Sequence, residues 1–296
     1  MAEVRVEEPD GIKPQGLVVR LMTAVVYSAV VLLAIWFGEH GLYGSSDPIV
    51  LGIVFGLFAG FAASEFYALC RREARLPNET FGVVAACAMP VFAAIWGMAG
   101  LTAVVTALIA ASLVWHVVFV RVRTSDTAVT VFGAVYTGFM LAYLVLILRV
   151  YESGMLFAYA VVLSVWANDS LAYLVGSTLG RHKMAPRISP KKSWEGFIAG
   201  VAGSVAVWVG LALIFRQTGI GVAFAVSVGV VVGVAVFVGD LFESRMKREA
   251  GVKDSGHLLP GHGGFLDRLD SLILVCLVVY WLLHWGGIAM HAASLR

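Results

Sequence analysis

Four polar side chains recur along one face of a helix predicted around residue 240. Asp240, Glu243, Ser244 and Lys247 follow one another at i, i+3, i+4 and i+7, the spacing that aligns side chains on a helix. The stripe combines two acids, a hydroxyl and a cation directly after an apolar run. Carboxylate oxygens are ligands that Mg2+ prefers, and lysine binds phosphate oxygens. The stripe therefore predicts phosphate chemistry that depends on a divalent cation.

A glycine-punctuated loop follows this stripe and leads into the last apolar segment. The loop contains Lys253 and the pair Gly263 and Gly264, whose missing side chains allow a backbone to approach a bulky ligand closely. Asp267 and Asp270 come next, one helical turn apart, so they share a face of the helix expected there. Two more acids are thereby predicted beside the same loop.

A fourth aspartate, Asp169, lies within an apolar segment, where an ionisable residue indicates a functional site by default. Helical spacing places it on one stripe with Tyr173, and a hydrogen bond between helices is the alternative interpretation. Asp169, Asp240, Asp267 and Asp270 all fall at the same predicted membrane boundary. These oxygen donors, without cysteine, favour Mg2+ over zinc, and we expect them to be the metal ligands.

The loop RHKMAPRISPKKSWEG, residues 181–196, carries a second candidate phosphate site. Ser189 and Pro190 stand in the order expected for the N-cap and first residue of a helix. Lys191 and Lys192 would then lie in its first turn, where the helix dipole disfavours cations unless an anion is bound. We expect a phosphate there. The alternative is the ordinary surplus of basic residues in a cytoplasmic loop.

The elements that must position these residues are membrane-spanning helices. Of the 296 residues, 60% are hydrophobic and only 14% charged, and the mean hydropathy is +0.88. These values exclude an ordinary soluble domain and predict an all-α polytopic membrane protein with about nine spans. The predicted spans are 17–38, 48–70, 81–97, 100–120, 129–149, 155–175, 196–215, 220–242 and 269–290.

The distribution of basic residues predicts how the chain is oriented. With the N-terminus cytoplasmic, 18 of the 21 Lys and Arg residues fall on cytoplasmic segments. The predicted spans 81–97 and 100–120 are separated only by a few residues around Gly97 and Gly100, so a merged span or a re-entrant hairpin is the alternative there. Losing one span would invert the later loops and place their basic residues outside.

The two halves of the chain differ in their loops, which are short in residues 1–150 but long and charged at 176–195 and 243–268. We divide it into a cytoplasmic tail, residues 1–16, a transmembrane region of about five helices, 17–150, and a catalytic transmembrane region of about four helices with two long cytoplasmic loops, 151–296. Glu65 in the first half is expected to pair with Arg71 or Arg72 or to be functional, and His116 to be structural.

Other chemistries find little support. Cys70, Cys87 and Cys276 stand singly in or beside apolar segments and are interpreted as small core residues. His257 and His262 lack the spacing of a zinc site, so hydrogen bonding within the loop is the simpler interpretation. The chain has no GxxxxGK[ST] phosphate loop, and its formal charge of +2 is too small to indicate a nucleic-acid partner.

The segment Ser244 to Asp270, SRMKREAGVKDSGHLLPGHGGFLDRLD, resembles the signature of phosphatidate cytidylyltransferases, also called CDP-diacylglycerol synthases. The Asn168-Asp169 pair and the SPKKSWEG segment resemble the same family, whereas the first 150 residues match only in hydropathy. The resemblance implies an enzyme of phospholipid biosynthesis in a bacterial-type inner membrane. It would convert phosphatidate and CTP to CDP-diacylglycerol and pyrophosphate, with Mg2+ required and the site facing the cytoplasm. A second cation and a homodimer are left open.

The predicted roles follow from the residues and the resemblance together. Asp240 and Asp267, helped by Asp270 or Asp169, would hold Mg2+ on the nucleotide phosphates. Lys247 and Lys253 complete the predicted catalytic set. The predicted substrate-binding residues are Ser189, Lys191, Lys192, Ser193, Ser244, Arg248, His262, Gly263, Gly264 and Arg268.

Two rival functions remain at this stage. A CTP-dependent polyprenol kinase would use similar acids and lysines but transfer the γ-phosphate. A transporter of a phosphorylated metabolite would also carry intramembrane Asp and Lys, but no paired repeats or broken helices indicate one. A CDP-alcohol phosphotransferase is disfavoured because its DGxxAR motif is absent.

Overall fold

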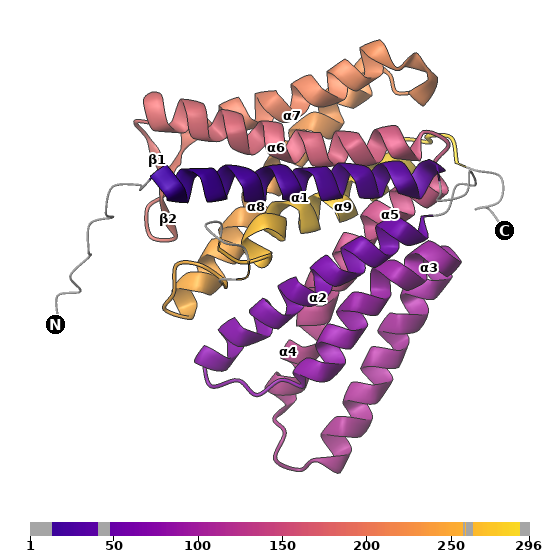
Figure 1. Cartoon of the computed structure of the whole chain (residues 1–296), viewed down its shortest axis with the longest axis vertical. Helices are drawn as coiled ribbons and strands as arrows, with labels where there is room; N and C mark the ends of the chain where they lie inside the picture. Colours follow the sequence, from indigo (N-terminus) through magenta and orange to yellow (C-terminus); the bar gives the residue numbers. More distant parts are fainter. Residues whose placement is uncertain (1–13, 41–47, 257, 259–262, 291–296) are drawn as a thin grey trace.

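The computed structural model describes residues 14–40, 48–256, 258 and 263–290, and most of them are helical (Figure 1). The all-α prediction is therefore confirmed. The helices are α1 Pro14–His40, α2 Ile49–Arg72, α3 Glu79–Val118, α4 Thr124–Ala134, α5 Met140–Val150, α6 Gly154–Thr178, α7 Trp194–Ile214, α8 Val222–Glu249 and α9 Leu266–Trp285. The short elements are the π-helical turn η1 Val135–Phe139, the 3-10 turn η2 Arg216–Thr218, and the strands β1 Lys183–Ala185 and β2 Ser189–Ser193.

Seven helical stretches within the described ranges are long and apolar enough to cross a membrane. One of them is the continuous rod Thr124–Val150, in which η1 joins α4 to α5 without a break. Large apolar side chains such as Leu21, Val25 and Leu163 are exposed on the outer faces of the helices. Such faces are stable against lipid, and helices satisfy their own backbone polar groups there. The chain is an integral membrane protein.

Helix α3 is a helical hairpin and not a single rod. Gly97 has φ +62° and ψ −140°, a backbone conformation that glycine adopts without the steric cost of a side chain. The rings of Phe81 and Trp115 lie 5.7 Å apart, whereas 34 residues of straight helix would separate them by about 50 Å. Figure 1 shows the two arms side by side. The predicted spans 81–97 and 100–120 are therefore separate antiparallel helices.

The number of helical segments agrees with the predicted topology. Counting the two arms of α3 separately and adding the 20-residue α9, the described residues form nine membrane-length segments. The seven stretches that meet the length and apolarity criteria treat α3 as one helix and leave out α9. Nine crossings would place the start of α1 and the end of α9 on opposite sides of the membrane.

One end of the bundle carries most of the charge, and we call it the basic end. It contains the α2–α3 turn, the β1–β2 hairpin and the α8–α9 loop, with the backbone N–H of Leu76 donating to Asp126 at the start of α4. The opposite end is closed by Tyr151, which pairs with Met290 and donates its hydroxyl to the Tyr280 carbonyl. Most basic residues of the interhelical loops thus gather at one end, as the orientation argument requires, with Arg216 of the α7–α8 loop at the other.

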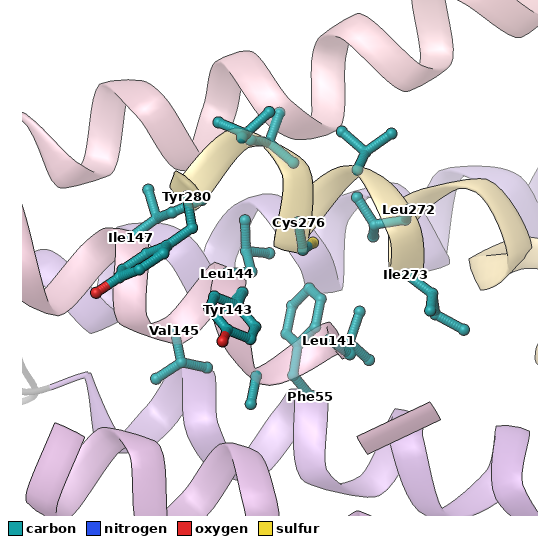
Figure 2. Close-up of a cluster of buried hydrophobic side chains, with 14 of the residues drawn as sticks. Phe55, Leu141, Tyr143, Leu144, Val145, Ile147, Leu272, Ile273, Cys276 and Tyr280 are labelled. Carbon is teal, nitrogen blue, oxygen red and sulfur yellow. The ribbon is translucent and has the colours of Figure 1, made fainter. Parts of the chain in front are cut away.

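The apolar core joins the two halves of the sequence. Figure 2 shows side chains of α5, including Leu141 and Leu144, packed against Ile273 and Cys276 of α9 and Phe55 of α2. All five are fully buried. The division at residue 150 stays a prediction about function, but the helices on either side of it share this core. The last helix is therefore held in place by the first half of the chain.

The hairpin in α3 determines which side of the membrane the 119–123 turn occupies. In a cysteine-free background, Leu76→Cys, before α3, and Val120→Cys, after it, should react with an impermeant maleimide from the same side of sealed vesicles, and Gln217→Cys from the other. All three positions are exposed. Labelling of Leu76→Cys and Val120→Cys from opposite sides would mean that α3 crosses once, and would contradict the hairpin.

Candidate active site

The predicted stripe on α8 is confirmed as one face of a helix, and Asp240 is its first member. The Lys192 ammonium from β2 lies 2.6 Å from Asp240 Oδ2, and the Ser244 hydroxyl donates to Oδ1 at 3.1 Å. Lys192 also lies over the ring of Phe237, 4.7 Å from its centroid. The buried ammonium contacts Asp240 without a well-directed hydrogen bond, so its hydrogens can turn to another acceptor.

Lys247, two helical turns after Asp240 on the stripe, joins the buried carboxylates of Glu243 and Asp267. Its ammonium lies 2.5 Å from Glu243 Oε2 and 2.6 Å from Asp267 Oδ1. The Glu243 and Asp267 side chains are only 1% and 7% exposed, and that of Lys247 is 12% exposed. A buried charge is tolerated only when it is paired, so these three groups depend on one another.

Asp267 organises the loop that precedes α9. Its Oδ2 accepts hydrogen bonds from the backbone N–H of Ser255 at 3.0 Å, from the Ser255 hydroxyl at 3.0 Å and from the Gly264 N–H at 2.8 Å. With Lys247 on Oδ1, both oxygens are engaged. Asp267 therefore holds the loop to the start of α9 on both sides of residues 257–262, through Ser255 and through Gly264.

Asp169 and Asp270 complete the group of acids. Asp270 interacts electrostatically with Asp169 and Asp240, so the three carboxylates of α6, α8 and α9 lie near one another. The helix–helix hydrogen bond considered for Asp169 belongs to its neighbour, because the Asn168 amide donates to Ser204 at 3.1 Å. Asp169 is left facing the cluster, but Tyr173 on the same stripe is 78% exposed.

The helix predicted to begin at Ser189 begins four residues later. Residues Ser189–Ser193 form strand β2, paired antiparallel with β1. Ser193 is the N-cap instead, because its hydroxyl oxygen accepts the Gly196 N–H at 3.2 Å. Lys191 and Lys192 therefore lie on a strand and not in the first turn of a helix. The prediction that Lys191 and Lys192 form a dipole-assisted phosphate site in the first turn of a helix was wrong in its geometry, but Lys192 does reach the acids.

Several other predicted residues that the structure describes are exposed or bonded away from the cluster. Arg248 donates to the Val252 carbonyl at 3.1 Å and closes the end of α8. Lys191 and Lys253 are exposed, and exposed Arg268 interacts electrostatically with Asp169. Gly263, half-buried, has φ +82°. His257 and His262 lie outside the described residues.

Glu65 is the residue whose role the sequence did not reveal. It does not pair with Arg71, which instead binds Glu79. Its carboxylate is 5% exposed and accepts three hydrogen bonds from the far half of the chain. The donors are the Ser255 hydroxyl at 2.9 Å, the Phe265 N–H at 3.1 Å and the Leu266 N–H at 2.9 Å. An acid in an apolar segment was the only available signal. His116, as expected, has a structural contact, with the Thr127 hydroxyl at 3.1 Å.

The carboxylate oxygens of the cluster suit Mg2+ only if a bound substrate supplies further oxygen ligands. Among the residues with described positions, no three His, Cys, Asp or Glu side chains converge closely enough to hold a metal on their own. Mg2+ commonly takes one or two carboxylates and completes its shell with phosphate oxygens and water. Asp240, Asp169 and Asp270 supply such oxygens, whereas Asp267 is already engaged by four donors. The arrangement suits a cation that arrives together with a phosphorylated substrate.

The fold and the cluster together define a polytopic membrane protein with a carboxylate and lysine site at one end of its helices. The sequence model of the cytidylyltransferase family matches residues 18–285. The chain belongs to the cytidylyltransferase family, which confirms the resemblance seen in the segment from Ser244 to Asp270.

Curated relatives carry the name phosphatidate cytidylyltransferase. The one from Bacillus subtilis is 39% identical over 154 residues, which are 51% of this chain and 56% of that protein. The one from Synechocystis is 43% identical over 131 residues, 44% of each protein. The one from Pseudomonas aeruginosa is 41% identical over 131 residues, 43% of this chain and 48% of that protein. The chain spans about half the length of the curated relatives it matches.

The pairing of Lys247 predicts a large effect on stability. Lys247→Met keeps the apolar stem but leaves Glu243 and Asp267 buried without their cation, so we expect a loss of about 3–5 kcal/mol in unfolding free energy. Arg245→Met is the matched control on the same helix. Its exposed pair with Glu249 should be worth less than about 1 kcal/mol. Equal melting temperatures of the two variants in detergent would contradict the buried pairing.

Proposed function

We propose that the protein transfers the cytidylyl group of CTP to phosphatidate, forming CDP-diacylglycerol and pyrophosphate in phospholipid biosynthesis. The observation that carries the proposal is the cluster of Asp169, Lys192, Asp240, Lys247 and Asp270 at the basic end of the helices. Family membership and the names of the relatives support it.

The chemistry requires charge control more than a strong base. The phosphate of phosphatidate is already largely anionic near neutral pH. One of its oxygens attacks the α-phosphorus of CTP, a new P–O bond forms, and the bond to the bridging oxygen breaks as pyrophosphate leaves with the electron pair. CTP carries about four negative charges, so the main task is to bring two anions together in line.

The cluster has the groups that this task needs. The Lys192 ammonium can turn from Asp240 to a phosphate oxygen, and the exposed Lys191, Arg248 and Lys253 add positive charge at the basic end. We assign Mg2+ binding to Asp240 with Asp270, helped by Asp169, while Asp267 holds Lys247 and the loop beside them. Bound Mg2+ would supply neutralisation of the nucleotide phosphates.

The position of the cluster at one end of the helices is consistent with a lipid substrate. A phosphatidate headgroup lies at the interface, and the cluster lies where α6, α8 and α9 meet the basic end. By the positive-inside rule we assign this end to the cytoplasm, where CTP is found. We assign the protein to the inner membrane of a bacterium, in line with its bacterial relatives.

The function is tested by following label from CTP. Purified protein given phosphatidate, Mg2+ and CTP labelled at the α-phosphate should place label in the lipid fraction, whereas label at the γ-phosphate should leave as pyrophosphate. The difference follows from attack at the α-phosphorus. Lipid labelled only from γ-labelled CTP would instead identify a kinase. Binding without label in lipid from either position would favour the transporter.

The metal assignment predicts that Asp240→Asn abolishes turnover in a folded protein. Loss of a ligand charge costs several kcal/mol of transition-state stabilisation, so the rate should fall at least about 100-fold. Asp267→Asn should lose as much activity and also melt at a lower temperature, because Asp267 secures the loop. Glu249→Gln, near the end of the same helix, is the control. Near-normal turnover of Asp240→Asn at saturating Mg2+ would remove Asp240 from the ligand set.

A further inference from the structure

We infer that Glu65 is a positioning residue, through which the N-terminal half of the protein sets the geometry of the active-site loop. The inference rests on the proposed function, because it concerns the loop that carries Asp267. Glu65 lies on α2, outside the segment that resembles the family signature, and 201 residues before Leu266, to which it is hydrogen-bonded.

The first argument is the placement of the carboxylate. Glu65 accepts the N–H groups of Phe265 and Leu266, which are free donors at the start of the 20-residue α9. A carboxylate at a helix N-terminus is favoured by the dipole, and each of these bonds is charge-assisted. Glu65 thus caps α9 from another helix and fixes where α9 begins, one residue before Asp267.

The second argument is that the loop is shaped to admit this carboxylate. A Cβ added to Gly264 would lie 2.2 Å from Glu65 Oε2, and one added to Gly256 would lie 2.4 Å from Oε1. Gly264 was expected to make room for a substrate. Its missing side chain instead makes room for Glu65, so two glycines and one acid form a matched set.

The third argument links Glu65 directly to the cluster. The Ser255 hydroxyl lies 2.9 Å from Glu65 Oε2 and 3.0 Å from Asp267 Oδ2. Asp267 in turn holds Lys247. A shift of Glu65 is therefore transmitted through one serine to the carboxylate and lysine of the site. Such a displacement changes the rate more than substrate binding, because in-line geometry matters most in the transition state.

The kinetic test uses a graded series at position 65. Glu65→Ala removes every acceptor and should lower kcat by about 10- to 100-fold with the KM for phosphatidate changed less than about threefold. Glu65→Gln keeps one acceptor oxygen and should lie between Glu65→Ala and the wild type. Glu79→Gln, from the exposed pair with Arg71, is the control and should leave kcat unchanged. Full kcat in Glu65→Ala would overturn the inference.

A double-mutant cycle tests the matched set. Gly256→Ala should force Glu65 out of its place and reproduce the loss in kcat, because the nearest atoms to the added Cβ all belong to Glu65. Adding it to Glu65→Ala should then cost little more, since the clash and the hydrogen bonds are both already gone. Strictly additive losses would mean that Gly256 does not act through Glu65.

Hydrogen exchange separates this inference from the proposed function. In Glu65→Ala the amides of Phe265 and Leu266 should exchange at least about tenfold faster, while α5 is unchanged. This readout needs no substrate, so it stands even if the purified protein makes no CDP-diacylglycerol. Unchanged exchange at both amides would overturn the inference. Faster exchange with unchanged kcat would reduce Glu65 to a structural cap. Glu65→Gln provides the same comparison if Glu65→Ala does not fold.

Discussion

The pairing of Lys247 with Glu243 and Asp267 is the interaction on which the rest of the site depends. Three ionisable side chains lie almost out of reach of water, and each is acceptable there only because of the others. The pairing joins α8 to α9 and, through Asp267, orders the loop between them. The more exposed acids, Asp169, Asp240 and Asp270, lie beside this pairing on α6, α8 and α9.

Periodicity and hydropathy were enough to predict the helical class, the number of segments and the stripe on α8, because these depend on neighbours in the sequence. The hairpin at Gly97 was likewise visible as two apolar runs with glycines between them. The start of α7 was misplaced because Ser189 and Ser193 are both plausible N-caps, and only the pairing of β1 with β2 decides between them.

Contacts between segments far apart in the chain could not be predicted from the sequence. Glu65 has basic residues within two turns, so a local ion pair was the simplest prediction, whereas its partners lie 190 to 201 residues away. For the same reason Gly264 was assigned to substrate binding. The division into residues 17–150 and a catalytic region, 151–296, therefore leaves out the contacts between them. Helices α2 and α5 of the first region form the surface against which α9 of the second packs.

The order of synthesis gives the Glu65 contact a further meaning. Helices enter the membrane from the N-terminus onward, so Glu65 is inserted while its partners at Ser255, Phe265 and Leu266 do not yet exist. Until α9 is inserted, the Glu65 carboxylate lacks these hydrogen-bond donors. The apolar surface of α2 and α5 that α9 covers is also without its partner. Insertion of the last helix then supplies the hydrogen-bond donors of Glu65 and brings Asp267 to Lys247 in one step, so a chain truncated before α9 lacks the assembled cluster.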